Sequence, residues 1–260
     1  MATIAFIGTG KIAQAFIKGL AEAKWNLVAY DPSTEALKLA EKLGATSEKD
    51  SISAVKKAET VIVCTKPEKV TTVLNELSGD LGKKLVISVA AGVPTQKILA
   101  ALNKKIALVR AMPNTPSLVS AGITAIYGEE GSNLEKVDLL MSSVGNTVRL
   151  KKEDHIDVAT AISGSGPAYA FLLIEAMALI GVELGLSKEI SLNLAKNTVF
   201  GAGKLCMAAS DSPEILRENV TSPGGTTEAA LKILMNENSL KNLMADAIKA
   251  AHQRSLELRK

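Results

Sequence analysis

The feature that most constrains the fold is a glycine turn near the N-terminus, Gly8-Thr9-Gly10-Lys11-Ile12-Ala13. It directly follows the apolar run Ile4–Ile7 and opens a helical pattern. This is the G-x-G-x-x-A form of a dinucleotide fingerprint: the first glycine allows a tight turn, the second lets a pyrophosphate approach, and the small alanine lets the helix pack closely. The alternative is a structural turn that binds no phosphate. We expect a dinucleotide to contact Gly8, Thr9, Gly10, Lys11 and Ile12.

The first part of the chain alternates short β-type runs with helical patterns, which predicts parallel strands joined by crossover helices. The β-type runs are Thr3–Ile7, Asn26–Tyr30, Val61–Thr65, Leu85–Val89, Ala107–Ala111 and Ile123–Tyr127. A doubly wound Rossmann sheet is the economical arrangement. We therefore predict an α/β fold whose dinucleotide-binding domain covers residues 1–154.

After about His155 the sequence becomes helical in character. Five segments are rich in Ala, Leu, Met, Glu and Lys: Tyr169–Leu184, Lys188–Ala208, Pro213–Asn219, Thr226–Asn236 and Ser239–Leu258. The run Tyr169–Ile174 is apolar on every face, which favours an interface between subunits, with a central core helix as the alternative. We predict an all-helical domain over residues 155–260 for dimerisation and substrate binding.

Composition narrows the classes of partner. The 260 residues are 47% hydrophobic, enough for a sizeable core, and only 3% aromatic with a net charge of +3. No basic stripe with interleaved aromatic residues is present, so we expect no nucleic acid partner. The apolar stretch Ala168–Val182 carries Glu175 and is shorter than the roughly 20 residues that span a bilayer, so we expect a buried helix and no membrane. The N-terminus lacks the features of a signal peptide, which predicts a cytoplasmic protein.

The cysteines and histidines give no sign of redox or metal chemistry. Cys64 and Cys206 lie among apolar residues, where a free thiol packs as a small hydrophobe. Neither His155 nor His252 has a cysteine or histidine at a metal-ligand spacing. We expect no metal site.

Asp31 lies about 20 residues beyond the fingerprint, where a carboxylate accepts hydrogen bonds from the ribose hydroxyls of NAD. In a second interpretation Asp31 caps the following helix, and in a third Ser33 or Thr34 faces a 2′-phosphate. The choice between NADH and NADPH stays open on these residues.

Further loops follow the ends of predicted strands, where ligands bind to an open parallel sheet. We expect Thr65, Lys66, Pro67 and Ala91 to line the nicotinamide side. Lys66 precedes a proline, which holds it extended and lets its ammonium point into the cleft, unless it is simply a solvated loop lysine. Asn114 either contacts the nicotinamide or fixes a turn before Pro116.

Six motifs in order make the chain resemble the pyrroline-5-carboxylate reductase family over about residues 1–258. They are Gly8-Thr9-Gly10, Thr65-Lys66-Pro67, Ala90-Ala91-Gly92-Val93, Met112-Pro113-Asn114-Thr115-Pro116, Ser163-Gly164-Ser165-Gly166-Pro167-Ala168-Tyr169 and Ser222-Pro223-Gly224-Gly225-Thr226-Thr227. The last two motifs are far more specific than the glycine fingerprint.

The resemblance implies hydride transfer from NADPH or NADH to the imine carbon of 1-pyrroline-5-carboxylate, giving proline, the final step of proline biosynthesis. It also implies an intertwined homodimer and leaves open a larger assembly of dimers. By the family pattern Thr227 lies against the ring nitrogen, Asn219 faces the cofactor and active site, and Glu153 falls near the substrate of a partner chain.

The turn Ser222–Thr227 supports this chemistry from its own residues. A Pro-Gly-Gly turn that leads into a helix presents free N–H groups to an anion, so we expect Gly224, Gly225 and Thr226 to hold the substrate carboxylate. Ser222 is a further candidate for substrate binding, unless it only caps the helix. Thr227 and Lys66 are the candidate catalytic residues. The alternative is that Thr226 and Thr227 merely cap a helix.

Two rival functions remain at this point. A relative of the β-hydroxyacid dehydrogenases or imine reductases needs a catalytic lysine on a long helix, with an asparagine one turn later. Here the position one turn after Lys204 is Ala208, so the match is poor. A non-catalytic dinucleotide sensor has no use for the intact turn Ser222–Thr227. A small-molecule reductase fits the residues best.

Overall fold

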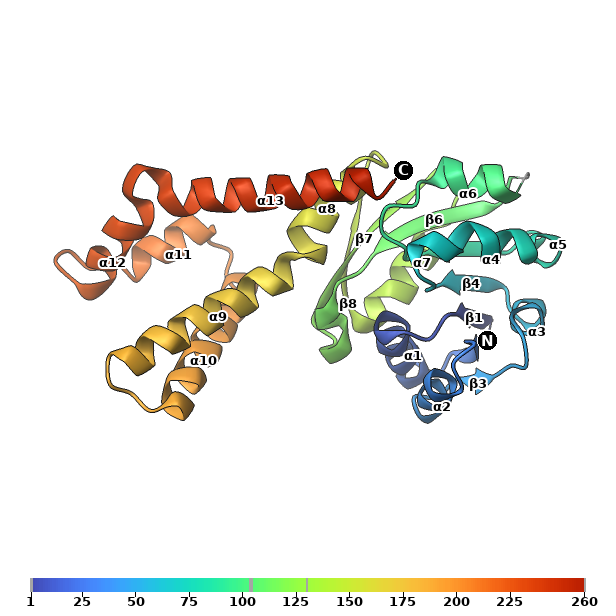
Figure 1. Cartoon of the computed structure of the whole chain (residues 1–260), viewed down its shortest axis with the longest axis horizontal. Helices are drawn as coiled ribbons and strands as arrows, with labels where there is room; N and C mark the ends of the chain where they lie inside the picture. Colours follow the sequence, from blue (N-terminus) through green and yellow to red (C-terminus); the bar gives the residue numbers. More distant parts are fainter. Residues whose placement is uncertain (1, 103–104, 130, 260) are drawn as a thin grey trace. The chain divides into compact units, whose positions relative to one another are not determined.

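A mostly parallel sheet forms the centre of the first part of the chain (Figure 1). The computed structural model describes residues 2–102, 105–129 and 131–259. Within them the eight strands have the order β3-β2-β1-β4-β5-β6-β7-β8. Their bounds are β1 (Thr3–Ile7), β2 (Asn26–Tyr30), β3 (Thr46–Ser47), β4 (Thr60–Val63), β5 (Leu85–Ser88), β6 (Ala107–Met112), β7 (Gly122–Gly128) and β8 (Gly145–Arg149).

The first six strands confirm the predicted Rossmann fold. They run parallel in the order 3-2-1-4-5-6. The strands that follow β1 in sequence are added first on one side of it and then, from β4 onward, on the other side, so the switch point lies between β1 and β4. β1 and β2 pair from Thr3 with Asn26 to Ile7 with Tyr30, so their carboxyl ends lie level. The sequence did not predict that β7 runs antiparallel to β6, nor that β8 extends the sheet beside β7.

Helices cover both faces of this sheet and complete two hydrophobic layers (Figure 1). Because side chains alternate along a strand, Ile4 and Phe6 of β1 enter one layer while Ala5 and Ile7 enter the other. The first layer includes residues of α1 (Lys11–Glu22), α2 (Thr34–Lys42) and α7 (Leu134–Met141). The second includes residues of α3 (Ser51–Lys57), α4 (Val70–Glu76), α5 (Ser78–Leu81) and α6 (Thr95–Leu102).

Single-turn helices connect these elements. They are η1 (Pro67–Lys69), η2 (Thr115–Val119) and η3 (Ser142–Val144), followed by α8 (His155–Ala159) and the π-helical turn η4 (Thr160–Gly164). Through η4 the helix continues from His155 to Glu183, 29 residues with a mean hydropathy of 1.6 in its most apolar window. The prediction that this stretch is too short to span a bilayer was therefore wrong in length, because the turn at Ser163–Ser165 does not break the helix. It is the one such helix in the described part of the chain.

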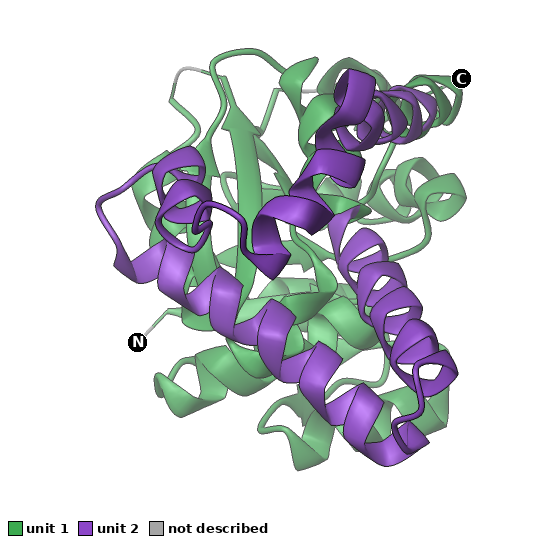
Figure 2. Cartoon of the chain, turned by 90° about the vertical axis from the view of Figure 1, so that its left-hand side faces the viewer, with its two compact units in different colours: residues 1–165, 251–260 green, residues 166–250 purple. Residues whose placement is uncertain are grey.

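The chain forms two compact units (Figure 2). Unit 1 comprises residues 1–165 and 251–260, and unit 2 comprises residues 166–250. The helices from residue 166 onward match the five predicted segments closely: α9 (Gly166–Glu183), α10 (Lys188–Ala208), α11 (Pro213–Asn219), α12 (Thr226–Met235), η5 (Asn236–Asn238) and α13 (Ser239–Glu257). Ser187 and Ser212 start α10 and α11 as N-caps, each accepting a backbone N–H three residues on. The division into functional domains at residue 154 stays a prediction.

Unit 2 buries very little of its own apolar surface. No residue of α9, α11 or α12 is buried, and in α10 only Ser191 and Ala195 are. Phe171 is 63% exposed and Leu172 is 65% exposed. The expectation of a buried helix is thus not met within the single chain, because the unit has too few helices to enclose α9. The exposed apolar faces favour the interpretation of α9 as an interface helix.

Candidate active site

Gly8 is required by the close approach of two strand ends. Its φ of +93° favours glycine, and a Cβ there would lie 2.8 Å from the carbonyl oxygen of Cys64. The Gly8 N–H donates to the carbonyl of Tyr30 at 2.8 Å. The loop therefore turns tightly between the carboxyl ends of β2, β1 and β4. This is the switch point of the sheet, where dinucleotides bind.

The start of α1 is open to an anion. Gly10 is its N-cap, with no side-chain cap, and the first turn holds no acidic residue. A Cβ on Gly10 would meet no described heavy atom within 4 Å. Ala13 is fully buried against the sheet, as the fingerprint predicts for its third small residue. The geometry fits a pyrophosphate held by the first-turn N–H groups of Lys11 and Ile12.

Two threonine hydroxyls at these strand ends lack protein partners. Thr9 is fully buried, and neither its Oγ1 nor that of Thr65 has a hydrogen-bond partner among the described residues. Buried hydroxyls are normally paired. Both threonines were predicted to contact the cofactor, and their unpaired oxygens fit a polar ligand at this position.

Asp31 contacts the glycine loop directly. Its Oδ2 accepts the Thr9 N–H at 2.7 Å, and its Oδ1 accepts the Ser33 N–H at 2.8 Å. Ser33 is the N-cap of α2, accepting the Ala36 N–H at 3.3 Å. The alternative in which Asp31 caps that helix was wrong, because Ser33 takes the role.

The loop after β4 has the predicted form. Lys66 is exposed and extended, with φ −59° and ψ 145°, and Pro67 begins η1 behind it. Burial raises the pKa of the Cys64 thiol, which fits its interpretation as a packing residue. Lys66 therefore lies at the carboxyl end of β4 beside the glycine loop.

The loop after β5 packs against the end of the chain. Gly92 has a φ of +72°, and a Cβ there would lie 2.9 Å from the Cβ of Leu258. Ala91, predicted to line the nicotinamide side, precedes this glycine and is half-buried. The C-terminal residues thus form part of the surroundings of a predicted cofactor loop.

Asn114 bridges two segments of unit 1. Its Oδ1 accepts the Ile123 N–H at 3.0 Å, and its Nδ2 donates to the carbonyl of Ser163 at 3.1 Å. The side chain is 8% exposed. These bonds favour a structural role, although it is not the predicted turn before Pro116 that they fix.

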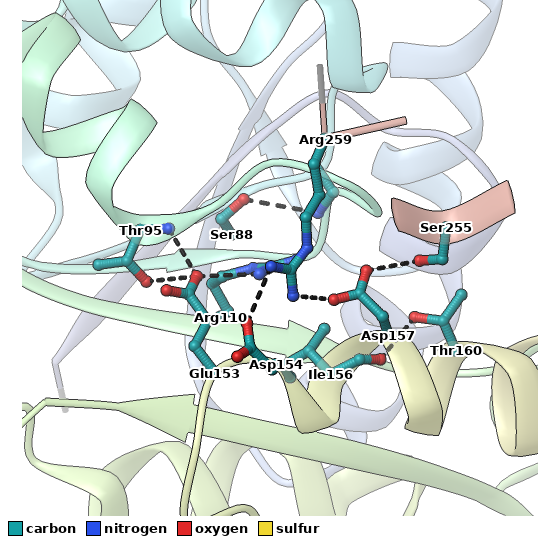
Figure 3. A network of polar contacts seen from close by, with 11 residues as sticks. Ser88, Thr95, Arg110, Glu153, Asp154, Ile156, Asp157, Thr160, Ser255 and Arg259 are labelled. Atoms are coloured by element: carbon teal, nitrogen blue, oxygen red, sulfur yellow. Dashed lines mark hydrogen bonds and ion pairs between the residues drawn. The ribbon is translucent and has the colours of Figure 1, made fainter. Parts of the chain in front are cut away.

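Glu153 is held by a buried network (Figure 3). Its Oε1 accepts the Thr95 N–H at 2.6 Å and the Thr95 hydroxyl at 2.9 Å. Arg110, only 1% exposed, donates to the same oxygen at 2.9 Å. The sequence prediction missed this network, although an arginine inside the apolar strand β6 was a usable signal, since a buried charge needs a partner.

A second network joins the C-terminus to α8 (Figure 3). Asp157 is fully buried, accepts the Ser255 hydroxyl at 2.6 Å and pairs with Arg259. Arg259 also contacts Asp154 at 2.9 Å, and that hydrogen bond lowers the pKa of Asp154. Burial alone would lower the pKa of Arg259, but its bonds to Asp157 and Asp154 outweigh this and raise it. We call Ser255 and Arg259 with their two aspartates the C-terminal latch.

The second glycine turn lies in unit 2 at the start of α12. Gly224 has a φ of +72°, and its N–H donates to Glu228 Oε2 at 2.8 Å. The Gly225 N–H donates to the carbonyl of Ser222 at 3.0 Å, and a Cβ on Gly225 would lie 2.5 Å from Ser222 Oγ. Both glycine amides are engaged within the turn. The glycines therefore shape it.

The amides that remain open belong to α12 itself. Gly225 is the N-cap and offers no side-chain cap. In the described part of the chain, no partner is recorded for the N–H groups of Thr226 and Thr227, the first two residues of the helix. Thr227 is half-buried, whereas Asn219 at the end of α11 is exposed. This turn can hold a small carboxylate and place a hydroxyl beside it.

The fold and the site together define a dinucleotide-dependent oxidoreductase. Comparison with known families agrees: "NADP oxidoreductase coenzyme F420-dependent" matches residues 3–92, and "Pyrroline-5-carboxylate reductase dimerisation" matches residues 153–258. The pyrroline-5-carboxylate reductase of Pseudomonas aeruginosa is 38% identical over 98% of this chain and 96% of its own length. The chain belongs to the pyrroline-5-carboxylate reductase family, as its motifs indicated.

Solved structures of this family superpose on the whole chain. The pyrroline-5-carboxylate reductase of Coxiella burnetii is 38% identical, with a TM-score of 0.92 over 100% of this chain and 99% of its own. The Plasmodium falciparum pyrroline carboxylate reductase with NADP bound is 30% identical, with a TM-score of 0.86 over 100% and 98%. Both the Rossmann unit and the helical unit are therefore family features.

Proposed function

We propose that this chain reduces 1-pyrroline-5-carboxylate to L-proline with hydride from NADPH or NADH, the final step of proline biosynthesis. It is an enzyme that acts on a carbon–nitrogen double bond. One observation carries the proposal: a single chain holds a glycine loop with open α1 amides at the β1–β4 switch point and a second glycine turn with open α12 amides. The first suits a dinucleotide and the second suits a small anion.

Unit 1 holds the cofactor, which supplies the hydride when bound. The first turn of α1 takes the pyrophosphate, and Asp31 takes the adenosine ribose. The predicted contacts in unit 1 are Gly8, Thr9, Gly10, Lys11, Ile12, Asp31, Ser33, Thr65, Lys66, Pro67, Ala91 and Asn114. Asn219 of unit 2 is a further predicted contact. The exposed ammonium of Lys66 adds a positive charge beside the switch point, which favours an anion there.

The turn that begins α12 holds the substrate. The N–H groups of Thr226 and Thr227 donate hydrogen bonds to its carboxylate, and Ser222, Gly224 and Gly225 keep the turn in shape. Protonation of the ring nitrogen makes the adjacent carbon electrophilic, and the Thr227 hydroxyl hydrogen-bonds at that nitrogen. As hydride adds to the carbon, the electron pair of the double bond moves to nitrogen and leaves a neutral amine. Because threonine is a weak acid, its hydroxyl orients the ring or relays a proton.

Glu153 approaches the substrate of a partner chain in this proposal. Thr95 and Arg110 occupy its Oε1, so the substrate contact falls to Oε2. The buried arginine then fixes the direction of the carboxylate. Glu153 both orders the loop before α6 and faces the neighbouring site.

The enzyme acts in the cytoplasm as a homodimer whose helical domains intertwine, and the proposal leaves open a larger assembly of dimers. The exposed apolar residues of α9 and α10 support this, and the family match for dimerisation covers both helices. That match also includes the long apolar helix from His155 to Glu183, which supports a protein interface over a bilayer. Sedimentation of the purified chain should show dimers or larger species, and a monomer at micromolar concentration would contradict the assembly.

The reaction is tested by following the oxidation of NADH and NADPH in parallel, with and without 1-pyrroline-5-carboxylate. We expect oxidation only when the imine is present, with proline as product. Cofactor binding without turnover would instead identify a dinucleotide sensor. Oxidation without the imine would point to another substrate.

A further inference from the structure

The carboxylate of Asp31 is fixed against the glycine loop. Asp31 is the first residue after β2, and that strand pairs with β1 up to Ile7 and Tyr30. The Thr9 and Ser33 N–H groups hold its two oxygens at 2.7 and 2.8 Å. The carboxylate is therefore positioned by backbone on both sides and is ready to receive a ligand without rearrangement.

The negative charge of Asp31 has no cationic partner. Both of its donors are neutral amides, and none of the ion pairs among the described residues includes it. The segment Asp31–Ala36 contains no lysine or arginine, and the first turn of α2 adds Glu35. The Ser33 hydroxyl already accepts the Ala36 N–H. At the end of β2 the site therefore presents the Asp31 carboxylate, and the segment Asp31–Ala36 supplies no lysine or arginine to this edge.

Such an edge distinguishes the two nicotinamide cofactors, which differ only at the 2′ position of the adenosine ribose. A carboxylate accepts hydrogen bonds but cannot donate them, so it suits the 2′-hydroxyl of NADH. The 2′-phosphate of NADPH carries between about −1.5 and −2 charges at neutral pH and is normally paired with arginine. Beside an unpaired carboxylate it is repelled.

We propose that Asp31 makes this enzyme selective for NADH over NADPH, by accepting the ribose hydroxyls of the one and repelling the 2′-phosphate of the other. The inference rests on the proposed function only in assuming a nicotinamide dinucleotide. The Plasmodium falciparum relative was solved with NADP bound, and the proposal predicts that this chain prefers the cofactor without the 2′-phosphate. Asp31 acts here as a specificity-determining residue.

The test measures binding without catalysis. ADP-ribose and 2′-phospho-ADP-ribose carry the adenosine half of each cofactor, and calorimetry with the full-length wild-type enzyme gives their dissociation constants. We expect ADP-ribose to bind at least about 10-fold more tightly at low salt, where charge repulsion is least screened. Steady-state kcat/KM for NADH and NADPH should show the same preference.

Asp31→Asn is the informative variant, because it keeps an oxygen for the Thr9 N–H and removes the charge. We expect the ratio of the two dissociation constants to fall to about 1–3, chiefly through tighter binding of 2′-phospho-ADP-ribose. Asp50→Asn is the matched control. Asp50 also accepts a backbone N–H at 2.7 Å, from Ser53 at the start of α3, so its replacement should leave the ratio unchanged.

The wild-type measurement decides the proposal without depending on any variant. Equal or tighter binding of 2′-phospho-ADP-ribose overturns it, as does a variant that weakens both ligands equally. If the imine is reduced equally well with both cofactors, the reductase assignment stands and the Asp31 proposal fails. If ADP-ribose is preferred but no imine is reduced, the proposed reaction fails and the role of Asp31 stands.

Discussion

Unit 1 and unit 2 are both rich in apolar residues, but they use them differently. In unit 1 the side chains of Phe6, Phe16 and Ile62 are completely buried by the chain itself. In unit 2, Phe171 and Phe200 are 63% and 67% exposed. Apolar content alone therefore does not distinguish a self-contained core from a surface that needs a second molecule. Burial within the single chain makes this distinction, and it shows that the apolar surface of unit 2 is left uncovered.

This difference predicts two kinds of stability. Unit 1 should unfold with a free energy that is independent of protein concentration, since its contacts are internal. Unit 2 should become more stable as concentration rises, because association buries its apolar surface.

The largest effect should come from matched phenylalanine substitutions. Phe16→Ala removes a fully buried ring from unit 1 and should cost about 3–5 kcal/mol of unfolding free energy at any protein concentration. Phe171→Ala removes an exposed ring from α9 and should instead weaken association. Urea unfolding and sedimentation over a range of concentrations measure both effects. The contrast breaks if Phe171→Ala destabilises the chain equally at all concentrations.

Disruption of the C-terminal latch should lower the unfolding free energy nearly as much. Among the described residues, Arg259→Ala leaves the fully buried Asp157 side chain with only the Ser255 hydroxyl and should lower the unfolding free energy of unit 1 by about 3 kcal/mol. Arg254→Ala is the control, since Arg254 pairs with Glu257 at an exposed site and should cost less than about 1 kcal/mol. Equal losses in the two variants would show that the latch does not stabilise unit 1.

Thr227→Ala tests chemistry in unit 2 without touching a core. It should lower turnover by roughly 10- to 1000-fold, because it removes a positioned polar group beside the ring nitrogen. Cofactor affinity should stay nearly constant, since the cofactor is assigned to unit 1. Thr227→Ser, which keeps the hydroxyl, should retain most of the activity. Wild-type turnover in the alanine variant would remove Thr227 from the mechanism.

The smallest expected effect is a pH dependence of the unfolding free energy of unit 1. The hydrogen bond from Arg259 depresses the pKa of Asp154 below its ordinary 3.8, so the unfolded chain takes up that proton first as the solution is acidified. The contribution to stability is therefore present above pH 3.8 and is lost as the pH falls through the folded value. Comparison of the wild type with Asp154→Asn by urea unfolding should show a difference at neutral pH that disappears in acid. A difference that grows in acid would contradict this sign.

Much of the fold could be predicted from the sequence, because its signals are local. Alternating β-type runs located β1, β2, β4, β5, β6 and β7, and the segments rich in Ala, Leu, Met, Glu and Lys located the helices from α9 to α13. The antiparallel direction of β7 was not predicted, since strand direction depends on pairing with β6 rather than on the run itself. The uninterrupted π turn at Thr160–Gly164 was also missed, because its glycine suggested a break.

In the candidate site too, local features could be predicted from the sequence and long-range contacts could not. The glycines that need a positive φ or a close approach, Gly8 and Gly224, were recognisable from their motifs. The bonds that engage the amides of Gly224 and Gly225 were not, because Glu228 reaches the turn only once α12 has formed. The contact between Asp157 and Ser255 joins residues 98 positions apart, and isolated charged or hydroxyl residues leave no local pattern.

The return of the C-terminal residues to unit 1 has a consequence for synthesis on the ribosome. Domains generally fold in the order in which they emerge. Asp157 is translated before unit 2, but its partners Ser255 and Arg259 are translated only after all of unit 2. Leu258, which packs against Gly92, is likewise translated only after unit 2. Unit 1 begins to be synthesised before unit 2 but is therefore completed only after it.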